Sequence, residues 1–512
     1  MRRTLAVVPF LVAALPAQLA GPYTINPTWP SSASNFASLL DATTALATQG
    51  VAGPVEFWIY DDAGPFTEAT PFVTNVAYAP NTAVLVLTQW TGSSAANRVT
   101  FRSAPGERAV FDAAGRAMGV FWGGADYVTL QGIEVKNATF DAISLFAEAS
   151  HGIVQDAIID RCQLHDCGGT GVTIYGNTPQ PANTLVQNCL LWRLQLTNAG
   201  TFNTTARFGY ITTRRSNGTR IVHNTFVADT GVGSMFCVLG AYPSGTAEVP
   251  YAEVSNNIVV KTANAAAPFL RMQSPAGTLY PVPVVCESNC WHDTSGGPFA
   301  LWGTSATTTS ATLLDWQLTA FRDLASIQGP PQFVDGANRD YHLLATSPCL
   351  GASTVAASVA DDLDQQPRTT AIDIGADEFS AATSTPVGAS CVGTGGLGPF
   401  LRTNVPFLGN PAFAGYLANV PPGLLVVLFG SVGLSPVPIP FGAGCTVYLD
   451  PPTLTSLAVA LAGPVGTTSF VYALPANPAF VGVQLGWQSL VLDAGAPLGF
   501  TLTNGVDLLF AF

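Results

Sequence analysis

The chain has 512 residues, of which 48% are hydrophobic and only 10% are charged, with 50 Gly and 38 Pro. This composition is too apolar for intrinsic disorder and too rich in turn-forming residues for long helices. The 19 Lys and Arg face 32 Asp and Glu, which gives a formal net charge of −13. We therefore expect no nucleic-acid partner, because phosphate binding needs clustered cations.

The N-terminus has the regions of a secretory signal peptide, which we assign to residues 1–20. The basic pair Arg2-Arg3 precedes an apolar run from Leu5 to Leu15 and a stretch of small residues. The mature chain is expected to begin near Gln18 or Gly21 and to be secreted or to lie at the cell surface. No later segment reaches ~18 uninterrupted apolar residues, so we expect no transmembrane span.

Residues from Ser34 to Gly50 predict an amphipathic helix. Ser34 or Asn35 can cap its start, and Gly50 ends it. The residues expected on its apolar face are Phe36, Leu39, Leu40 and Leu46. The helix precedes a series of repeats, so we expect its apolar face to plug the open end of the first repeat.

A unit of three strands joined by turns then repeats along the chain. The corner residues of five aligned units are Gly132, Arg161, Asn188, Asn224 and Asn256, spaced 27 to 36 residues apart. Gly and Asn suit such corners because both tolerate left-handed backbone angles. Three strands per unit indicate three parallel sheets. The expected fold class is all-β: a right-handed, three-sheet parallel β-helix over residues 21–380, including the N-terminal capping helix and a closing segment.

Two stretches carry a family resemblance. The segments Ser103-Ala-Pro-Gly-Glu-Arg-Ala-Val-Phe-Asp112 and Asp126-Tyr-Val-Thr-Leu-Gln-Gly-Ile-Glu-Val135 resemble the opening coils of pectin-lyase-like right-handed parallel β-helix proteins. Downstream, Pro331-Gln-Phe-Val-Asp335 and Asp373-Ile-Gly-Ala-Asp-Glu-Phe379 resemble the closing segment of a bacterial secreted subfamily with a variable C-terminal anchor-type domain. The resemblance implies the fold and export, and it leaves the activity open.

Residues 381–390 predict a linker of Ser, Thr and Pro, and residues 391–512 predict a smaller antiparallel β-sandwich, since short apolar strands alternate with Gly and Pro turns. Cys391 and Cys445 are the only cysteines of this part, so we predict that they pair in a disulfide. Cys162 and Cys189 share a register in adjacent coils, inside the ~4.4–6.8 Å Cα window of a disulfide. They either bond or stack as small apolar groups.

The candidate site is a row of turn residues after the second strand, because equivalent positions of successive coils lie ~4.8 Å apart. A lyase for uronate polymers needs a base, a cation or arginine that neutralises the carboxylate, and a sugar-binding surface. The candidates are Lys136 or His165 as base, Asp141 and Asp166 as cation ligands, Arg193 or Arg207 as carboxylate clamp, and Trp192, Tyr175 and Tyr210 as binding residues. The alternative is that these are solvated turn residues, and no recognisable lyase motif is present.

Two carboxylate groups have further alternatives. A hydrolase needs carboxylates ~5 to 9.5 Å apart, and the nearest local group is Asp156, Asp160 and Asp166, which does not match the hydrolase pattern. A second acidic cluster could hold calcium, the one cofactor that the sequence suggests: Asp361, Asp362, Asp364, Asp373, Asp377 and Glu378. Its alternative, which we prefer, is a structural closing segment in which Arg368 neutralises one or two of the acids.

Two functions therefore remain. The favoured one is an exported protein that engages extracellular polysaccharide or cell-surface polymers through the flank of its β-helix, in a binding or structural role. The other is a polysaccharide lyase or, less favoured, a glycoside hydrolase. Lys136, His165, Asp166 and Arg193 would converge in a shallow cleft in the lyase and would splay into solvent in the binding protein.

Overall fold

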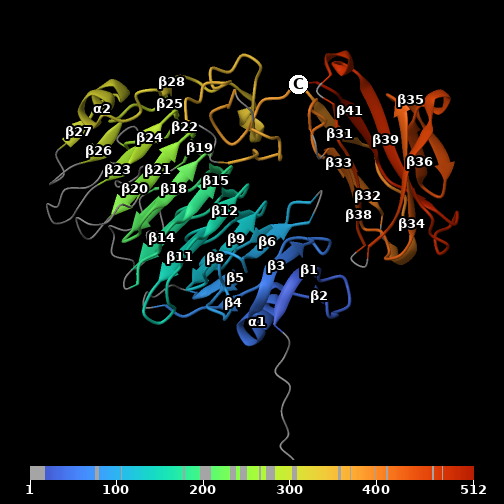
Figure 1. Cartoon of the computed structure of the whole chain (residues 1–512), viewed down its shortest axis with the longest axis horizontal. Coiled ribbons are helices and arrows are strands. Elements are labelled where there is room, and N and C mark those ends of the chain that lie inside the picture. The colour runs from blue at the N-terminus through green and yellow to red at the C-terminus, as the bar shows by residue number, and fades with distance from the viewer. Residues whose placement is uncertain are drawn as a thin grey trace, which may run out of the picture.

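The computed structural model describes residues 18–74, 80–104, 107–176, 179–195, 209–230, 238–242, 251–263, 267–272, 283–302, 308–355, 359–368, 371–396, 398–410, 413–463, 466–475 and 477–511. A long stack of strands, coloured blue to yellow in Figure 1, lies beside a second unit coloured orange to red. Most of the assigned signal peptide lies outside the described residues. Strand β1 begins at Leu19, so a mature chain starting near Gln18 would keep this strand whole.

The stack is a solenoid of three sheets, and each complete coil adds one strand to each sheet. The first sheet has the order β2 (Asn35–Phe36), β1 (Leu19–Ile25), β3 (Val51–Ile59), β6 (Val99–Ser103), β9 (Val128–Gln131), β12 (Ile158–Asp160), β15 (Leu185–Gln187), β18 (Thr219–Val222), β21 (Tyr251–Ser255) and β24 (Val285–Glu287). The second has the order β7 (Val110–Asp112), β10 (Glu134–Lys136), β13 (Gln163–His165), β16 (Leu190–Trp192), β19 (Thr225–Ala228), β22 (Ile258–Lys261), β25 (Cys290–Asp293) and β28 (Ile327–Gln328).

The third sheet closes each coil. Its order is β4 (Thr70–Pro71), β5 (Thr82–Leu87), β8 (Met118–Gly123), β11 (Ile143–Ala147), β14 (Val172–Gly176), β17 (Ile211–Arg214), β20 (Leu239–Tyr242), β23 (Leu270–Met272), β26 (Ala300–Trp302) and β27 (Thr308–Ser310). Successive coils pair in parallel, whereas β4 and β27 pair antiparallel with β5 and β26 at the two ends. The apolar side chains that point inward from all three sheets form one continuous core. This architecture confirms the expected three-sheet parallel β-helix.

The corner between the first and second sheets repeats with a left-handed backbone. Strand register places Gly132, Arg161, Asn188, His223 and Asn256 at equivalent positions. Their φ angles lie between 53° and 67°. A positive φ costs little at Gly and is best tolerated among other residues by Asn, Asp and His. The predicted corner row is therefore correct at four of its five positions, and His223 takes the fifth.

Asn224 stands one position past the corner, so its placement in the corner row was wrong. Its side chain belongs to a buried ladder with Asn257 and Asn289. Asn224 Oδ1 accepts from the Cys189 amide (2.9 Å), Asn257 Oδ1 accepts from the Asn224 amide (3.0 Å), and Asn289 Oδ1 accepts from the Asn257 amide (3.0 Å). A buried polar network whose members are all hydrogen-bonded favours one register over its neighbours.

Cys162 and Cys189 occupy the same column as this ladder, and both are buried free thiols in the structure. The bonded alternative of the prediction is therefore wrong, and the stacked one is observed. Residues in register on parallel strands point their Cβ atoms the same way, ~4.8 Å apart. A disulfide needs Cβ atoms ~3.8 Å apart.

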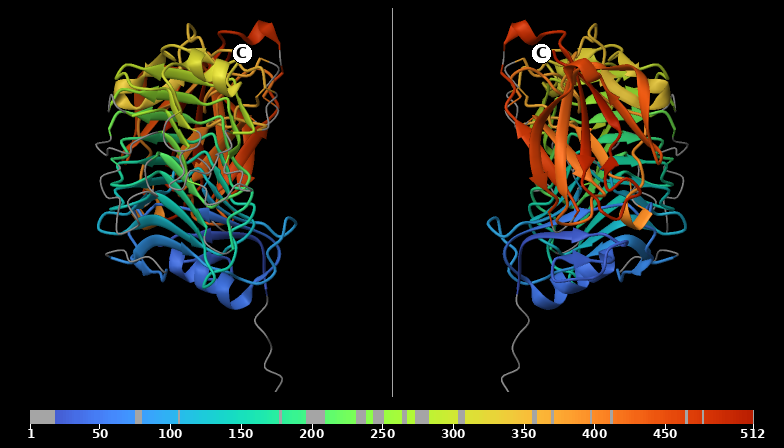
Figure 2. Two further views of the ribbon diagram at one scale, coloured as in Figure 1. Left: turned by 90° about the vertical axis from the view of Figure 1, so that its left-hand side faces the viewer. Right: turned by 90° about the vertical axis from the view of Figure 1, so that its right-hand side faces the viewer.

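A helix covers each end of the solenoid (Figure 2). Helix α1 (Leu39–Gln49) closes the first coil, and α2 (Leu313–Ala320) lies at the other end. The predicted start at Ser34 was wrong because β2 occupies that stretch, and Ser38 caps α1 instead. Leu40, expected on the apolar face, is 49% exposed. Within the described residues, no helix has the length and apolar character needed to span a membrane.

The closing segment, residues 331–379, packs against the outer face of the second sheet. It contains β29 (Phe333–Asp335), the 3₁₀ turn η1 (Gly336–Asn338) and β30 (Asp340–Leu343). Leu343 and Ile374 share a buried cluster with Leu190 and Ile258 of the second sheet. The closing segment therefore hides the outer face of β16, β19 and β22.

The second unit is a sandwich of two antiparallel sheets. The larger has the order β31 (Thr383–Val387), β41 (Gly505–Leu509), β39 (Gln484–Val491), β34 (Leu425–Val432) and β37 (Thr455–Leu461), with β40 (Thr501–Leu502) paired to β39. The smaller contains β32 (Phe400–Thr403), β33 (Phe413–Ala418) and β38 (Thr468–Tyr472), and β35 (Leu434–Gly442) and β36 (Cys445–Leu449) form a separate ribbon. The 3₁₀ turns are η2 (Thr394–Gly396), η3 (Pro451–Thr453) and η4 (Pro478–Phe480). Apolar side chains from both sheets share one core, as the predicted sandwich requires.

The predicted linker, residues 381–390, is in fact part of the sandwich. Thr383–Val387 forms β31, which pairs antiparallel with β41 along its whole length. Because β31 is an edge strand, the missing amide of Pro386 need not leave a ladder position unpaired. A Ser, Thr and Pro composition therefore did not distinguish a linker from an edge strand.

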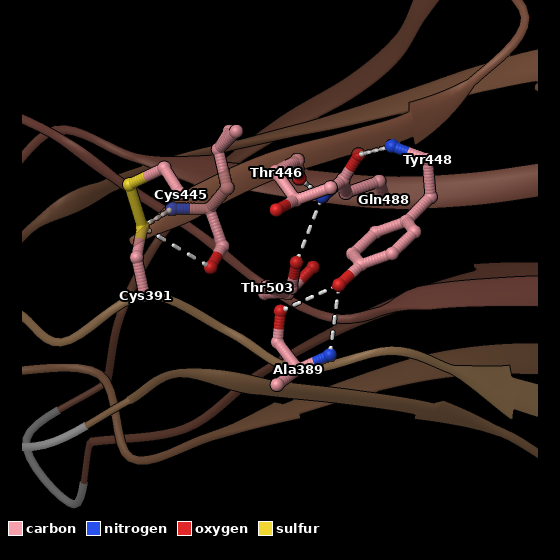
Figure 3. The surroundings of a disulfide bond; sticks show 8 residues. Ala389, Cys391, Cys445, Thr446, Tyr448, Gln488 and Thr503 are labelled. Carbon is pink, nitrogen blue, oxygen red and sulfur yellow. Dashed lines mark hydrogen bonds between the residues drawn. A yellow bond between two sulfur atoms is a disulfide. The ribbon is translucent and has the colours of Figure 1, made fainter. Parts of the chain in front are cut away.

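The β35–β36 ribbon is attached to the larger sheet by a disulfide and by a buried amide (Figure 3). Cys391 and Cys445 form the disulfide that the sequence predicted, with Cα atoms 4.6 Å apart. Gln488 of β39 accepts a hydrogen bond from the Tyr448 amide (3.0 Å) and donates to the Thr446 carbonyl (2.8 Å). These contacts fix the ribbon over one part of the sheet's outer face.

Candidate functional site

The row expected on the solenoid flank is present, but its members Lys136, His165 and Trp192 end strands of the second sheet and do not lie in the turns that follow. Lys136, His165 and Trp192 are direct neighbours across β10, β13 and β16. Glu134, which the sequence prediction missed, links the first two: Lys136 Nζ lies 3.1 Å and His165 Nε2 lies 3.3 Å from Glu134 Oε1. The hydrogen bond from His165 is the largest cause that lowers the pKa of Glu134 to about 2.

The next position of each coil continues this network. His165 Nδ1 lies 2.7 Å from Asp166 Oδ2, and Arg193 Nη2 lies 2.8 Å from Asp166 Oδ1. Lys136, His165, Asp166 and Arg193 are therefore connected in one network, whereas the shallow cleft that the lyase hypothesis also required stays a prediction. Each charge, however, already has a partner of opposite sign, so the network is electrically satisfied without a ligand.

Trp192 is no open platform for a sugar. Its ring stacks on the His165 ring, with centroids 4.2 Å apart and an interplanar angle of 10°, and Tyr341 of the closing segment lies 5.9 Å away. Only 6% of Trp192 is exposed. The prediction that Trp192 binds sugar by stacking is therefore wrong, because the closing segment covers it.

The other two aromatic candidates are buried as well. Tyr175 packs on Phe146 against the outer face of the third sheet, and the guanidinium of Arg214 lies over its ring at 5.4 Å. Tyr210 is fully buried, and its hydroxyl donates to the Val227 carbonyl. Neither ring is available to a polymer that runs along the flank, so both predictions are wrong.

Asp141 and Arg207 are the remaining predicted site residues. Asp141 is fully buried and accepts hydrogen bonds from Ser144 Oγ (2.6 Å) and from the Thr170 amide (3.2 Å), so it stabilises a turn. Arg207 lies outside the described residues. A calcium ion held by Asp141 and Asp166 stays a prediction.

The acidic cluster of the closing segment is largely structural, as the preferred alternative expected. Arg368 Nη1 pairs with Glu378 Oε2 at 2.9 Å, and Arg368 Nη2 donates to Asn188 Oδ1 of a corner. Asp362 accepts hydrogen bonds from backbone amides, among them that of Glu378. Asp361 pairs with Arg161 at 2.7 Å. Asp361 and Arg368 thus attach the closing segment to the solenoid, and Asp362 and Glu378 form contacts within the segment.

Three residues of this region could hold a metal ion by geometry. His342, Asp364 and Asp377 bring one ligand atom each to within 4.8 Å of one another. His342 is also bonded to Asp340 and Asp364, and the bond to Asp364 is the largest cause that raises its pKa to about 11. Without a metal, His342 therefore forms an ion-pair cluster with Asp340 and Asp364, and a calcium ion held by the acidic cluster stays a prediction.

A large cavity lies where the solenoid, the closing segment and the sandwich meet. It has a volume of about 760 Å³. The solenoid contributes its first corners, near Trp58 and Gly132, the closing segment contributes residues around His342, and the sandwich contributes β31, β32 and Tyr416 of β33. In Figure 1 the sheet of β32 and β33 lies on the side of the sandwich that faces the solenoid. We call this space the junction cavity.

Four of the chain's 19 cationic residues line the junction cavity. Arg161 is neutralised by Asp160 and Asp361. The other three are Arg102, Arg108 and Arg402. The guanidinium of Arg102 lies over the Trp58 ring at 4.2 Å, and that of Arg402 lies over the Phe400 ring at 4.8 Å. Burial lowers the pKa of Arg102 and of Arg402.

Two of these arginines have buried donors with no hydrogen-bond partner among the described residues: Arg102 Nε and Arg108 Nη1. Glu107 Oε2 is a buried acceptor without a partner. Burial, followed by repulsion from Asp62, raises the pKa of Glu107 to about 7. Unsatisfied buried donors are rare and costly, so they mark a place where a ligand can supply the acceptor.

Sequence reasoning missed the junction cavity, although one signal was present. Cations are scarce in this chain, yet Arg98, Arg102, Arg108 and Arg116 stand within one short stretch of the first coils. The contribution of Arg402 had no local signal, because it depends on how the sandwich docks.

Fold and site together define a parallel β-helix protein with a C-terminal sandwich and a junction cavity that four arginines and four carboxylates line. No protein-family model and no curated protein matches the chain. Among solved structures it is similar to a rhamnogalacturonan lyase, with 12% identity and a TM-score of 0.32 over 57% of this chain and 87% of that one. It is also similar to full-length tailspike protein 2 of Escherichia coli O157:H7 bacteriophage CAB120, with 10% identity and a TM-score of 0.18 over 89% of this chain and 59% of that one. Likenesses this weak carry no functional argument, so the fold assignment rests on the strand pairing.

Proposed function

We propose that this chain is an exported β-helix protein that binds an acidic extracellular polysaccharide in the junction cavity, in a binding rather than a catalytic role. One observation carries the proposal: the cavity contains buried arginine donors, Arg102 Nε and Arg108 Nη1, that no described residue satisfies. The planar guanidinium is suited to hydrogen-bond a carboxylate through two parallel N–H groups. Export through residues 1–20 is part of the proposal, because such polymers lie outside the cell.

The rest of the lining suits a sugar. A volume of about 760 Å³ lies within the ~300–1,000 Å³ range of small-ligand sites. Gln131, Gln365 and Asp364 offer hydrogen-bond partners to hydroxyl groups, and Tyr416 is a partly exposed ring at the edge of the cavity. The lining thus combines an aromatic ring, hydroxyl partners and arginines, together with the carboxylates of Glu107, Asp340, Asp364 and Asp377.

The test compares binding of matched acidic and neutral oligosaccharides, a uronate oligomer and its reduced neutral form, to the full mature chain by calorimetry. We expect the double variant Arg102→Gln/Arg108→Gln to bind the acidic oligomer at least ~10-fold more weakly, since a hydrogen bond to a charged group contributes ~1.5–3 kcal/mol. Arg220→Gln is the matched control, because Arg220 pairs with Glu253 elsewhere on the solenoid. Wild-type affinity in the double variant, or no binding of any acidic oligomer, would contradict the proposal.

A second candidate is a lyase that uses the flank network. The observation in its favour is that Lys136, His165, Asp166 and Arg193 are connected by contacts of 3.3 Å or less through Glu134. In this hypothesis a basic side chain takes the proton beside a uronate carboxylate, and calcium or Arg193 neutralises that carboxylate.

The lyase hypothesis predicts an unsaturated product that absorbs in the ultraviolet when the protein acts on pectin, alginate or another uronate polymer. Lys136→Ala or His165→Ala would then abolish the product, and a chelator would do so if calcium is required. Absence of the product across these polymers, together with binding in the junction cavity, would favour the binding role.

A further inference from the structure

Two free thiols lie on opposite sides of one packing interface. Cys290 begins β25 of the second sheet, and Cys349 lies in the closing segment 59 positions later. Both side chains are fully buried, and both belong to the outer apolar cluster that joins the closing segment to the second sheet. Both are free thiols in the structure. The pair therefore comes from two separate segments that pack against each other.

The other free thiols of the described residues have a different environment. Four of them point into the core of the solenoid: Cys162, Cys167, Cys189 and Cys286. Cys290 faces the opposite way, because its neighbour Trp291 belongs to that core and successive side chains of a strand point to opposite faces. Among the free thiols that the structure describes, only Cys290 and Cys349 meet across the interface with the closing segment.

Hydrogen bonds beside the pair hold the two segments in place. Ser288 Oγ lies 2.7 Å from Thr354 Oγ1 and accepts a hydrogen bond from the Thr354 amide at 2.9 Å. Ser288 stands two positions before Cys290, and Thr354 stands five positions after Cys349. The two thiols also interact directly: a hydrogen bond with Cys349 is the largest cause that raises the pKa of Cys290, and burial is the second.

We propose that Cys290 and Cys349 form a disulfide when the chain folds in an oxidising compartment, and that this bond fastens the closing segment to the second sheet. The register that keeps Cys162 and Cys189 apart does not constrain this pair. Cys349 lies in a turn and is not on a strand in register with β25, whose partners are β22 and β28. Its Cβ atom can therefore approach that of Cys290.

The bond forms by exchange with a protein disulfide of that compartment. One cysteine thiolate attacks the disulfide of the oxidant and releases its first thiol, and the second cysteine then attacks the mixed disulfide and releases the other. One S–S bond forms in the chain, one breaks in the oxidant, and the two hydrogens of the chain's thiols pass to the oxidant. Burial makes both thiols inaccessible in the folded chain, so the exchange takes place before the closing segment has docked completely.

The bond restrains a segment that contributes to two parts of the molecule. Tyr341 of the closing segment covers Trp192, and His342 lines the junction cavity. A cross-link at Cys349 holds this segment on the solenoid, because it limits how far the segment can separate from β25. It thereby stabilises the cover of Trp192 and one wall of the cavity.

Peptide mapping of the full mature chain without reductant tests the proposal. Chain produced in an oxidising compartment is alkylated while denatured and is then cut with trypsin, which separates Cys290 from Cys349 at Arg339. We expect a linked pair of peptides that is two hydrogen atoms lighter than the two free peptides together. The Cys391–Cys445 disulfide is the internal control, since it shows that the sample is oxidised.

Two variants identify the cysteine that is linked. We expect Cys290→Ser to abolish the linked pair and Cys286→Ser to retain it. Cys286 is the matched control, because it is a buried cysteine four positions earlier that points into the core, and a serine can keep its hydrogen bond to Asp323. Alkylation of both Cys290 and Cys349 in the oxidised sample would overturn the proposal. So would a linked pair that survives in Cys290→Ser.

Hydrogen exchange supplies a second readout that needs no variant. The reference is the wild-type chain from a reducing compartment. The amides of Leu343 and Ile374, which donate to Asp377 and to the Cys349 carbonyl, should exchange at least ~10-fold more slowly in the cross-linked chain. Equal exchange rates in the two samples would show that the bond does not fasten the closing segment.

Discussion

Single buried amides set the register of the solenoid. Asn257 is the central member of the ladder: its Oδ1 accepts from the Asn224 amide, and its Nδ2 donates to the Ile221 and Ser255 carbonyls. The next coil reciprocates, because Asn289 Oδ1 accepts from the amide of Asn257. One side chain thus satisfies the backbone of two neighbouring coils.

Asn257→Ala is expected to destabilise the chain by about 2–4 kcal/mol, because it leaves a buried amide and two buried carbonyls without partners. Urea unfolding followed by tryptophan fluorescence measures this loss. Asn338→Ala is the control: Asn338 is exposed, and its substitution should cost less than about 0.5 kcal/mol. Equal losses in the two variants would show that the ladder contributes no special stability.

Glu107 makes the junction cavity sensitive to pH. Because the pKa of Glu107 is raised in the folded chain, the folded chain binds this proton more tightly than the unfolded chain does. The stability that Glu107 contributes is therefore fully present below about pH 4.5 and is lost as the pH rises towards 7. An anionic ligand should bind more tightly at pH 6 than at pH 8, since protonation removes a negative charge beside Arg402. We expect Glu107→Gln to remove most of the difference in ligand affinity between pH 6 and pH 8. We attribute the rest of that difference to Asp377, whose pKa burial raises to about 6.

The corner column shows how far residues could be predicted. Four of five corner residues were identifiable from Gly, Asn and spacing, but the pairs His223-Asn224 and Asn256-Asn257 each offer two adjacent polar residues. Local sequence does not say which of two neighbours takes the left-handed backbone and which points inward. The column of Cys162 and Cys189 resolves this, since it places Asn224 one step past the corner.

At the scale of elements, helix α1 covers the end of the solenoid with one buried face and leaves its other face exposed. Leu39 and Leu46 are fully buried over the first coil, whereas Leu40 is half exposed. The carboxylate of Glu68, from the solenoid, accepts hydrogen bonds from the Leu39 and Leu40 amides at the helix start. This contact fixes the helix on the coil end.

Leu46→Ala should destabilise the first coils by about 3 kcal/mol, the usual cost of a cavity at a buried leucine. Leu40→Ala on the same helix is the matched control, with an expected cost below about 0.5 kcal/mol. Hydrogen exchange of the β1 and β3 amides reports the local effect. Equal exchange rates in the two variants would mean that α1 does not seal the stack.

Two elements that sequence reasoning missed, α2 and β31, were missed for different reasons. Helix α2 is short, but its start carries a capping box in which Thr312 and Asp315 bond each other's backbone, and this signal was readable. Strand β31 had no such signal, because its place is fixed by pairing with β41 about 120 residues later. Non-local pairing decides such strands.

At the scale of the whole molecule, the junction cavity forms because separate parts of the chain pack against one another. The junction cavity needs the solenoid corner, the closing segment and the sandwich together, and no single segment contains its arginines. The flank row was predictable because solenoid geometry repeats. The covering of Trp192 by Tyr341 was not, because a residue 149 positions later in the chain has to pack there.

The true boundary of the sandwich gives a prediction about truncation. A fragment that starts at residue 391 lacks β31 and exposes the edge of β41, whereas one that starts at residue 381 retains the pair. We expect the shorter fragment to melt at least ~5 °C lower, which corresponds to about 1 kcal/mol. Thermal unfolding by circular dichroism measures both, and equal midpoints would mean that β31 is dispensable.

The left-handed corner also bears on how such a chain is assembled. Successive corner residues are 29, 27, 35, 33 and 32 positions apart, yet strand register across the corner is kept from Gly132 to Ser288. Each coil thus offers the next coil strand edges in the same register, whatever the length of the loops between the strands. A chain that is synthesised from its N-terminus can add one coil at a time onto α1. An extra coil inserted at a corner would lengthen the solenoid and would leave the neighbouring coils unchanged.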